Sequence, residues 1–401
     1  MRQELENEHL SGLVLADSLT RVDCNIRLNG GEYQTDTLHL TINLERSRRK
    51  FKLTIMKKLL YTILTVFTFS SVFAGNPDRQ GESGAAQLLL NPWARSAGLH
   101  TMTTANVIGV EAMQLNIAGL SRVNKTQVMI GNTQYLKGTG IGLNAIGLSQ
   151  KLGENSAIGI QLMAVDFGKI PITTTNQPEG IGATYSPSFF NIGLGYSYTF
   201  QNKISVGFLV RGVSETLADI SAFGIAMDAG VQYVTGKKDE FKLGISLRNI
   251  GSPMKFGGEG LSIAQNAPEG NYQLTFNVRP ANYELPSMLN LGVSYDFDLG
   301  ENLILTGIGN FTSNSFAQDQ VGLGFNFAIG KFFQVRAGYK YEFGQFNESG
   351  LYASMDKGLS AGVSVEIPLK KNSESRLGLD YGYRHTTRWS GSHSIGVSIN
   401  L

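Results

Sequence analysis

The stretch Phe190–Phe200 reads FNIGLGYSYTF, and large apolar residues alternate in it with Asn, Gly, Ser and Thr. A repeat of two places successive side chains on opposite faces of a β-strand. The same alternation returns in LNLGVSYDFD (289–298), VGLGFNFAI (321–329), LSAGVSVEIPL (359–369) and SIGVSINL (394–401). The region 124–401 is therefore predicted to be all-β, built from strands with one apolar and one polar face.

Alternation alone also fits a soluble β-sandwich, and two further features favour a transmembrane barrel. The apolar face is unbroken in strand after strand, while the other face carries Gly, Ser and charge, as lipid outside and a polar lumen inside require. The connections also alternate between short turns and longer loops, which is typical of outer-membrane barrels. The charged residues on the predicted lumen face are Arg211, Asp228, Lys242, Arg248, Arg336, Lys340, Glu342, Arg376, Asp380 and Arg384.

Following the alternation along the chain predicts about 14 antiparallel strands, with boundaries uncertain by about two to four residues. Tyr272–Val278 also alternates, but we place it inside a long loop, 250–286, because an odd strand would exchange the two rims. The predicted strands are 124–135, 139–151, 155–167, 187–200, 202–214, 221–235, 239–250, 287–298, 301–312, 318–329, 331–343, 356–369, 375–386 and 392–401.

Residues 75–123 lack this alternation and are predicted to form a plug, or hatch, inside the lumen. Side chains fill the interior of an eight-stranded barrel, whereas wider barrels leave an open channel. A barrel of this predicted size therefore needs a filling. Leu88–Leu90, Trp93, Met113, Leu115 and Leu120 need burial, which favours a plug over the alternative of a disordered periplasmic tail.

Met56–Ala74, MKKLLYTILTVFTFSSVFA, has the order of a secretory signal peptide: a basic start, an apolar run and small residues at the end. Cleavage is predicted between Ala74 and Gly75. The alternatives are a short membrane anchor or a buried helix, but the apolar run is shorter than a membrane-spanning helix. The barrel is therefore expected in the bacterial outer membrane, in contact with its lipid.

Residues 1–55 are rich in charge and contain the only cysteine, Cys24. A domain ahead of a cleavable signal would be discarded on export, so we interpret 1–55 as a probable mis-called upstream segment. The predicted mature chain then offers no thiol for a disulfide or a metal. The formal net charge is +2 and charged residues make up 16% of the chain, which gives no electrostatic case for binding nucleic acid.

No catalytic or metal-binding arrangement is apparent, and no cofactor is predicted. The histidines after Gly75 are His100, His385 and His393, and none has the spacing of a metal site. His393 beside Ser392 and Ser394 is the only local candidate for an outer-membrane hydrolase. Neighbouring residues of a strand point to opposite faces, so these side chains cannot converge. The sequence therefore indicates that the protein is not an enzyme.

Asn116-Ile117-Ala118-Gly119-Leu120, followed by a barrel, resembles the N-P-A-G-L element that closes the hatch of FadL-like fatty-acid transporters, with Ile117 in place of proline. The run Ala94–Gly98 and the segments 166–168, 170–174 and 177–180 are similar to the PorV/PorQ family of the type IX secretion system. This resemblance covers about 85–400. It implies a FadL-type barrel of 14 strands, with Asn116, Ala118, Gly119 and Leu120 as a plug motif.

The same resemblance implies an accessory protein of type IX secretion that binds the translocon or the signal domains of secreted cargo. Long loops on a rigid scaffold often carry binding, so Met254, Phe256, Tyr272 and Phe276 of the 250–286 loop are the candidate partner-docking residues. The alternative for this loop is a lid that folds inward. The alternative function is a FadL-like channel for the uptake of small hydrophobic compounds.

Overall fold

The computed structural model describes residues 75–401 except 267, 269, 271, 301, 331, 345–356, 370–374 and 387–388. It contains a closed antiparallel β-barrel of 14 strands. The barrel strands are β1 (Thr126–Gln134), β2 (Gly142–Leu152), β3 (Ser156–Asp166), β6 (Ser188–Phe200), β7 (Ile204–Leu217), β8 (Ile220–Thr235), β9 (Phe241–Gly251), β12 (Met288–Gly300), β13 (Leu303–Asn314), β14 (Gln320–Ile329), β15 (Phe333–Glu342), β16 (Gly358–Pro368), β17 (Arg376–Arg384) and β18 (Ser392–Asn400).

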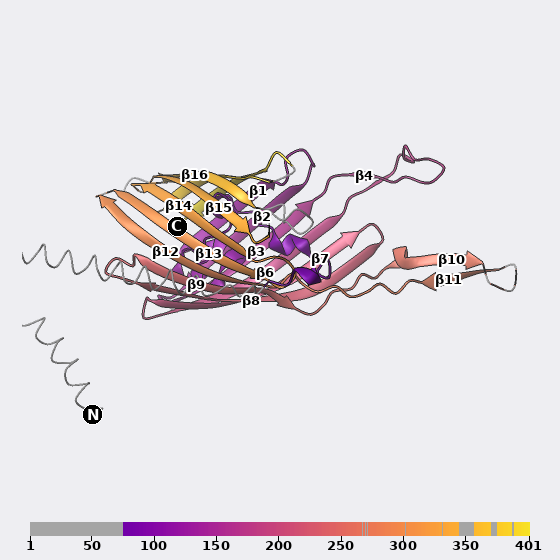
Figure 1. Cartoon of the computed structure of the whole chain (residues 1–401), viewed down its shortest axis with the longest axis horizontal. Helices are drawn as coiled ribbons and strands as arrows, with labels where there is room; N and C mark the ends of the chain where they lie inside the picture. The colour runs from indigo at the N-terminus through magenta and orange to yellow at the C-terminus, as the bar shows by residue number, and fades with distance from the viewer. Residues whose placement is uncertain are drawn as a thin grey trace, which may run out of the picture. The chain divides into compact units, whose positions relative to one another are not determined.

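Neighbours in sequence are neighbours in the barrel, and β1 closes it by pairing with β18, where Ile130 lies opposite Val397. The predicted fold class and strand number are confirmed. Two small hairpins lie outside the barrel sheet: β4 (Ile170–Pro171) with β5 (Thr184–Tyr185), and β10 (Ser262–Asn266) with β11 (Gln273–Asn277). Tyr272–Val278 is thus part of a loop hairpin and not of the wall (Figure 1).

The two rims differ as predicted. The turns 153–155, 201–203 and 236–240 join strands at the rim where the chain ends, which is the periplasmic side of such a barrel. The long connections 167–187 and 252–287 lie at the opposite rim, which we call the outer rim. Both extend past the barrel strands in the view of Figure 1, where they carry the labels β4, β10 and β11.

The alternation has the predicted physical basis, because one face of each strand is exposed and the other is buried. Leu323 and Phe325 of β14 expose 65% and 58% of their surface on the outside of the barrel. Arg211, Arg336 and Arg384 are buried inside it. The apolar exterior suits the lipid and the polar interior suits the lumen. Closure of the sheet pairs the backbone N–H and C=O groups of neighbouring strands and leaves no edge strand in the membrane.

Residues 75–123, the predicted plug, form short helical turns packed against the inner wall. These are η1 (Pro77–Arg79), η2 (Ala86–Leu89), α3 (Ala94–Ala97), η3 (Gly109–Glu111), α4 (Ala112–Leu115) and η4 (Ile117–Arg122). α3 packs on β16, β17 and β18, whereas η4 packs on β6, β7 and β8. The plug, indigo in Figure 1, therefore bridges walls that are distant along the chain.

The predicted signal peptide, its cleavage site at Ala74 and the upstream segment 1–55 lie outside the described residues apart from Gly75, so both interpretations stay predictions. Within the described part of the chain, every helix is too short and too polar to cross a membrane.

Candidate functional site

Asn116 of the predicted plug motif fastens the plug to the barrel wall. Its side-chain Nδ2 donates to the carbonyl oxygen of Thr104 at 2.8 Å and to that of Val231 on β8 at 3.1 Å. Its Oδ1 accepts from the backbone N–H of Ala118 at 3.2 Å, which caps η4. The segment 117–122 forms a 3₁₀ helix although Ile117 replaces the proline of the resembled motif.

Glycines on the lumen face of the barrel let the plug lie directly against the wall. A Cβ on Gly230 would come within 2.0 Å of Asn116 Oδ1, and a Cβ on Gly207 within 2.7 Å of the backbone of Ile117. Every barrel strand except β13 supplies such a glycine, and we call this ring the glycine belt. Its members are Gly131, Gly147, Gly159, Gly195, Gly207, Gly230, Gly244, Gly292, Gly322, Gly338, Gly362, Gly382 and Gly396.

A buried polar network joins the plug to β7 and β8. Arg211 donates to Gln114 Oε1 at 2.8 Å and to the carbonyl oxygen of Met113 at 2.9 Å. It also forms an ion pair with Asp228 at 3.1 Å. Gln161 donates to the same Gln114 oxygen at 3.1 Å. These contacts give the buried charges partners and hold α4 in one position, as buried polar groups require.

A second network lies under α3. Arg95 pairs with Asp380 at 3.2 Å and with Glu366 at 3.1 Å. Arg336 donates to the carbonyl oxygen of Arg95 at 3.1 Å. Glu111 of the plug lies close to this cluster, and burial raises its pKa to about 7 against the opposing attraction of Arg95. The plug therefore carries a carboxyl group whose charge changes near neutral pH.

The base of the 252–287 loop closes the outer rim by packing against the start of the plug. Met254 and Leu285 form a buried cluster with Ala85, Leu88 and Val213, and the cluster also includes Ala222 and Ala226 of β8. The base of this loop therefore folds inward, as the alternative interpretation of the loop as a lid expects.

Tyr283 adds a polar contact to this closure. Its hydroxyl donates to Glu215 at 2.6 Å. Burial raises the pKa of Tyr283, and the hydrogen bond to Glu215 raises it further.

The four candidate docking residues fall into two groups. Met254 is fully buried and offers no outer binding surface, whereas Phe256 is half-buried and packs on the cluster of Met254. Tyr272 and Phe276 are exposed on or beside the β10–β11 hairpin. The apolar character of the loop sequence could not distinguish these two groups, because apolar residues are buried at the base of the loop and exposed at its tip.

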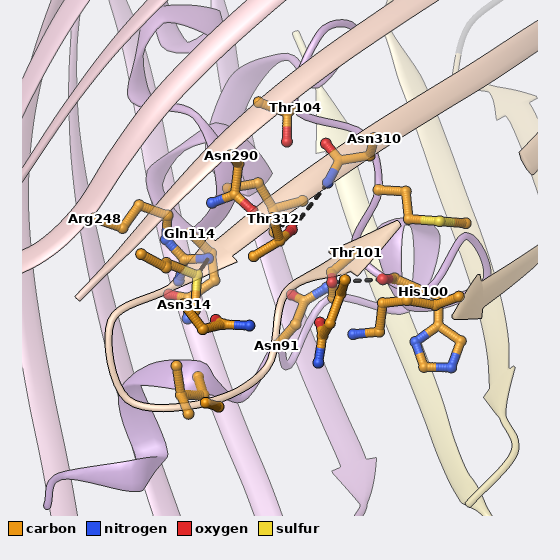
Figure 2. Close-up of a pocket in the computed structure, with 17 residues that line it drawn as sticks. Asn91, His100, Thr101, Thr104, Gln114, Arg248, Asn290, Asn310, Thr312 and Asn314 are labelled. Carbon is orange, nitrogen blue, oxygen red and sulfur yellow. Dashed lines mark hydrogen bonds between the residues drawn. The ribbon is translucent and has the colours of Figure 1, made fainter. Parts of the chain in front are cut away.

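A cavity of about 130 Å³, the outer cavity, lies between the plug and the wall near the outer rim. Figure 2 shows amide and hydroxyl side chains directed into it, including Asn290, Thr312 and Asn314. Leu89, Met102, Leu115, Met288 and Ala317 add apolar surface. The lining is therefore mainly polar, with five apolar residues among 17. The sequence reasoning did not identify this cavity, because its lining comes from distant segments.

A second cavity of about 200 Å³, the inner cavity, lies closer to the periplasmic rim and borders Glu111, Gln127 and Arg336. The plug segment 99–108 separates the two. Met102 and Thr104 line the outer cavity, while Thr103 and Ile108 line the inner one. We call this segment the partition.

Two residues of the partition that are not glycines adopt a left-handed backbone conformation. The φ values of His100 and Thr101 are 51° and 65°. Such conformations cost on the order of 1–3 kcal/mol each and are found where function requires a strained segment. Thr104 is held by Asn116 and by Gln232, whose Nε2 donates to its carbonyl oxygen at 3.3 Å.

The residues considered for hydrolysis do not converge. Ser392 and Ser394 are buried on the lumen face and bond to Leu136 and Thr133, respectively. His393 faces outward, 2.8 Å from the hydroxyl of Tyr381. Over the described ranges, no three acidic, histidine or cysteine side chains come together in a way that suits a metal ion.

No family model and no curated protein matches the sequence. Solved barrel structures do match. The CymD monoaromatic hydrocarbon channel is 16% identical over 76% of this chain and 95% of its own, with a TM-score of 0.48. The Pseudomonas putida toluene transporter TodX is 14% identical over 77% and 97%, with a TM-score of 0.49. A Pseudomonas aeruginosa FadL homologue is 12% identical over 76% and 96%, with a TM-score of 0.45.

These comparisons correct the main functional prediction. The similar structures are described as hydrocarbon channels and a FadL homologue, and not as secretion accessory proteins or enzymes. The predicted type IX secretion role, with translocon or cargo partners, was therefore wrong. The burial of Met254 agrees with this correction, because one of the four proposed docking residues packs inside the barrel instead. Membership of the PorV/PorQ family stays a prediction.

Proposed function

We propose that this protein is an outer-membrane channel that admits small, mainly hydrophobic compounds through its plugged lumen. The observation that carries the proposal is the pair of cavities on either side of the partition. A compound entering at the outer rim would occupy the outer cavity first. Movement of the partition would then connect it with the inner cavity and the periplasm.

The size of the outer cavity supports a small compound, and its five apolar lining residues offer that compound an apolar surface. A cavity of about 150 Å³ lined by apolar residues holds a molecule as large as benzene, and the outer cavity is about 130 Å³. The similar structures include channels described as taking monoaromatic hydrocarbons and toluene. The strained backbone at His100 and Thr101 makes the partition the part of the plug best suited to rearrange.

A disulfide that joins the partition to the barrel wall tests the proposal. A Cβ on Gly322 of β14 would lie 3.2 Å from Met102 Cγ, which is the place that the sulfur of a cysteine at 102 would take. The double variant Met102→Cys/Gly322→Cys can therefore form a bond, because truncation of Met102 removes the atoms closest to Gly322. The described residues contain no cysteine that would compete.

The readout is the uptake of radiolabelled toluene by cells that express the barrel and have no other such channel. We expect the oxidised double variant to lose uptake and to regain it on reduction. Each single-cysteine variant serves as the control for substitution alone. Uptake that continues unchanged through the cross-linked plug would refute the proposed route.

A further inference from the structure

Arg248 lies on the lumen face of β9 and lines the outer cavity, next to an irregularity in the wall. The pairing of β8 with β9 shifts register between Met227 and Ala229. Arg248 and the next residue, Asn249, are both buried, whereas a regular strand would turn one of them outward. Asn249 has a left-handed φ of 59°, and its backbone N–H donates to Asp228 Oδ1 at 2.6 Å. Arg248 thus keeps the lumen-facing parity of Gly244 and Ser246, and the bulge turns Asn249 inward beside it.

Among the described residues, this guanidinium forms no ion pair with a carboxylate. Asp228, whose charge acts on Arg248, already forms an ion pair with Arg211 through Oδ2 and accepts from Asn249 through Oδ1. Arg248 donates to the carbonyl oxygen of Leu88 at 3.2 Å and contacts the sulfur of Met288 at 3.6 Å. Its Nε has no partner among the described residues. Two guanidinium groups thus share one carboxylate.

A buried charge without a counter-ion is costly, so a partner for it is expected. Arg248 is only 6% exposed, and Asn290 beside it on β12 is 7% exposed. The side-chain Nδ2 of Asn290 is a second buried donor without a partner in the described chain. Figure 2 shows both side chains on the same side of the outer cavity, with Gln114 below them.

The remaining lining fits an anion with a compact apolar body. No described aspartate or glutamate lines the outer cavity, and Lys340 adds a second cation to it. Leu89, Leu115 and Met288 supply apolar surface next to Arg248. A guanidinium pairs with a carboxylate through parallel hydrogen bonds, which fix the orientation of the bound group.

We propose that Arg248 and Asn290 form a subsite for the carboxylate of a small organic acid in the outer cavity. The inference rests on the proposed channel function and adds to its substrates compounds with an apolar body and an anionic head. The subsite holds the head group at the bulge while the apolar body lies against Leu89 and Leu115.

The test measures binding of benzoate and of its neutral isostere benzamide to the detergent-solubilised barrel by calorimetry. We expect the wild type to bind benzoate at least about tenfold more tightly, which corresponds to about 1.4 kcal/mol. Arg248→Gln should remove this preference, and Arg248→Lys should retain part of it. Lys242→Gln is the matched control, since Lys242 lies on the same strand and pairs with Asp296 instead.

Equal affinity for benzoate and benzamide in the wild type would overturn the subsite, and so would a preference that survives Arg248→Gln. Sodium nitrate that competes as strongly as benzoate would overturn the organic part of the assignment. Heat-modifiable migration on gels verifies that each variant is folded. Failure of the channel proposal looks different: the disulfide would leave toluene uptake unchanged while the benzoate preference persisted.

Discussion

A methyl group added at Gly207 should disturb the packing of the plug against the barrel wall. Gly207 lies on the lumen face of β7, directly under η4. A Cβ there would lie 2.7 Å from the carbonyl carbon and oxygen of Ile117 and 2.9 Å from the backbone nitrogen of Ala118. These are backbone atoms and cannot rotate away, so Gly207→Ala must displace η4 from the wall.

The expected size follows from two opposing effects. Overpacking a well-filled site costs about 1–3 kcal/mol. Replacing a glycine inside a strand by alanine returns about 0.5–1 kcal/mol of conformational entropy. Gly207→Ala should therefore lower the free energy of unfolding by up to about 2.5 kcal/mol. Gly212→Ala on the same strand is the control, because its Cβ meets no atom closer than 3.5 Å and should be neutral or stabilising.

Urea unfolding of the two variants in detergent, followed by the fluorescence of Trp93 in the plug, measures this difference. Trp93 is fully buried, so its emission reports release of the plug. Liposome swelling in a small sugar gives an independent readout, and Gly207→Ala should be the leakier variant. If both alanine variants have the same free energy of unfolding and the same rate of liposome swelling, η4 does not pack directly against the wall at Gly207.

Three further outcomes are expected. Phe325→Arg should cost about 2–4 kcal/mol in bilayer unfolding, whereas Leu299→Arg at the rim should cost about 0–1, because the penalty depends on membrane depth. Equal costs would contradict the assigned depths of the two residues in the membrane. Asn116→Ala should lower stability by about 1–3 kcal/mol in thermal melts, since two buried carbonyl oxygens lose their donor. Glu111 has a pKa raised to about 7 from 4.5 in the native state. Its burial cost therefore appears as pH rises through this interval, and Glu111→Gln should flatten the fall in stability measured between these pH values.

The wall of the barrel was predictable because lipid and lumen impose opposite demands on alternate residues. Phe325 and Asn326 are neighbours in sequence and meet these two environments, so the period of two survives in every strand. The alternation of short and long connections then fixed which rim is which. Burial of Trp93 and Leu120 was likewise implied by their size, although their contacts were not.

The site was less predictable because it depends on contacts between segments far apart in sequence. Arg248 was assigned to the lumen face, but nothing in its local sequence reveals that Asp228 is already committed to Arg211. The docking prediction failed for a related reason. Met254 and Tyr272 are both apolar loop residues, and only the packing of Ala85 and Leu88 on the former shows that it is buried.

The interruption of the glycine belt at β13 coincides with one side of the outer cavity. Around most of the barrel, glycine brings the wall backbone against the plug and leaves no passage. At β13 the belt is interrupted, and Ile308 occupies the lumen face and packs on Leu99 and Met102 of the partition. The plug therefore stands away from β13 by the width of a side chain. Asn310, Thr312 and Asn314 of the same strand line the outer cavity. A passage along β13 needs only the partition to move, whereas a passage elsewhere would require the whole plug to leave the wall.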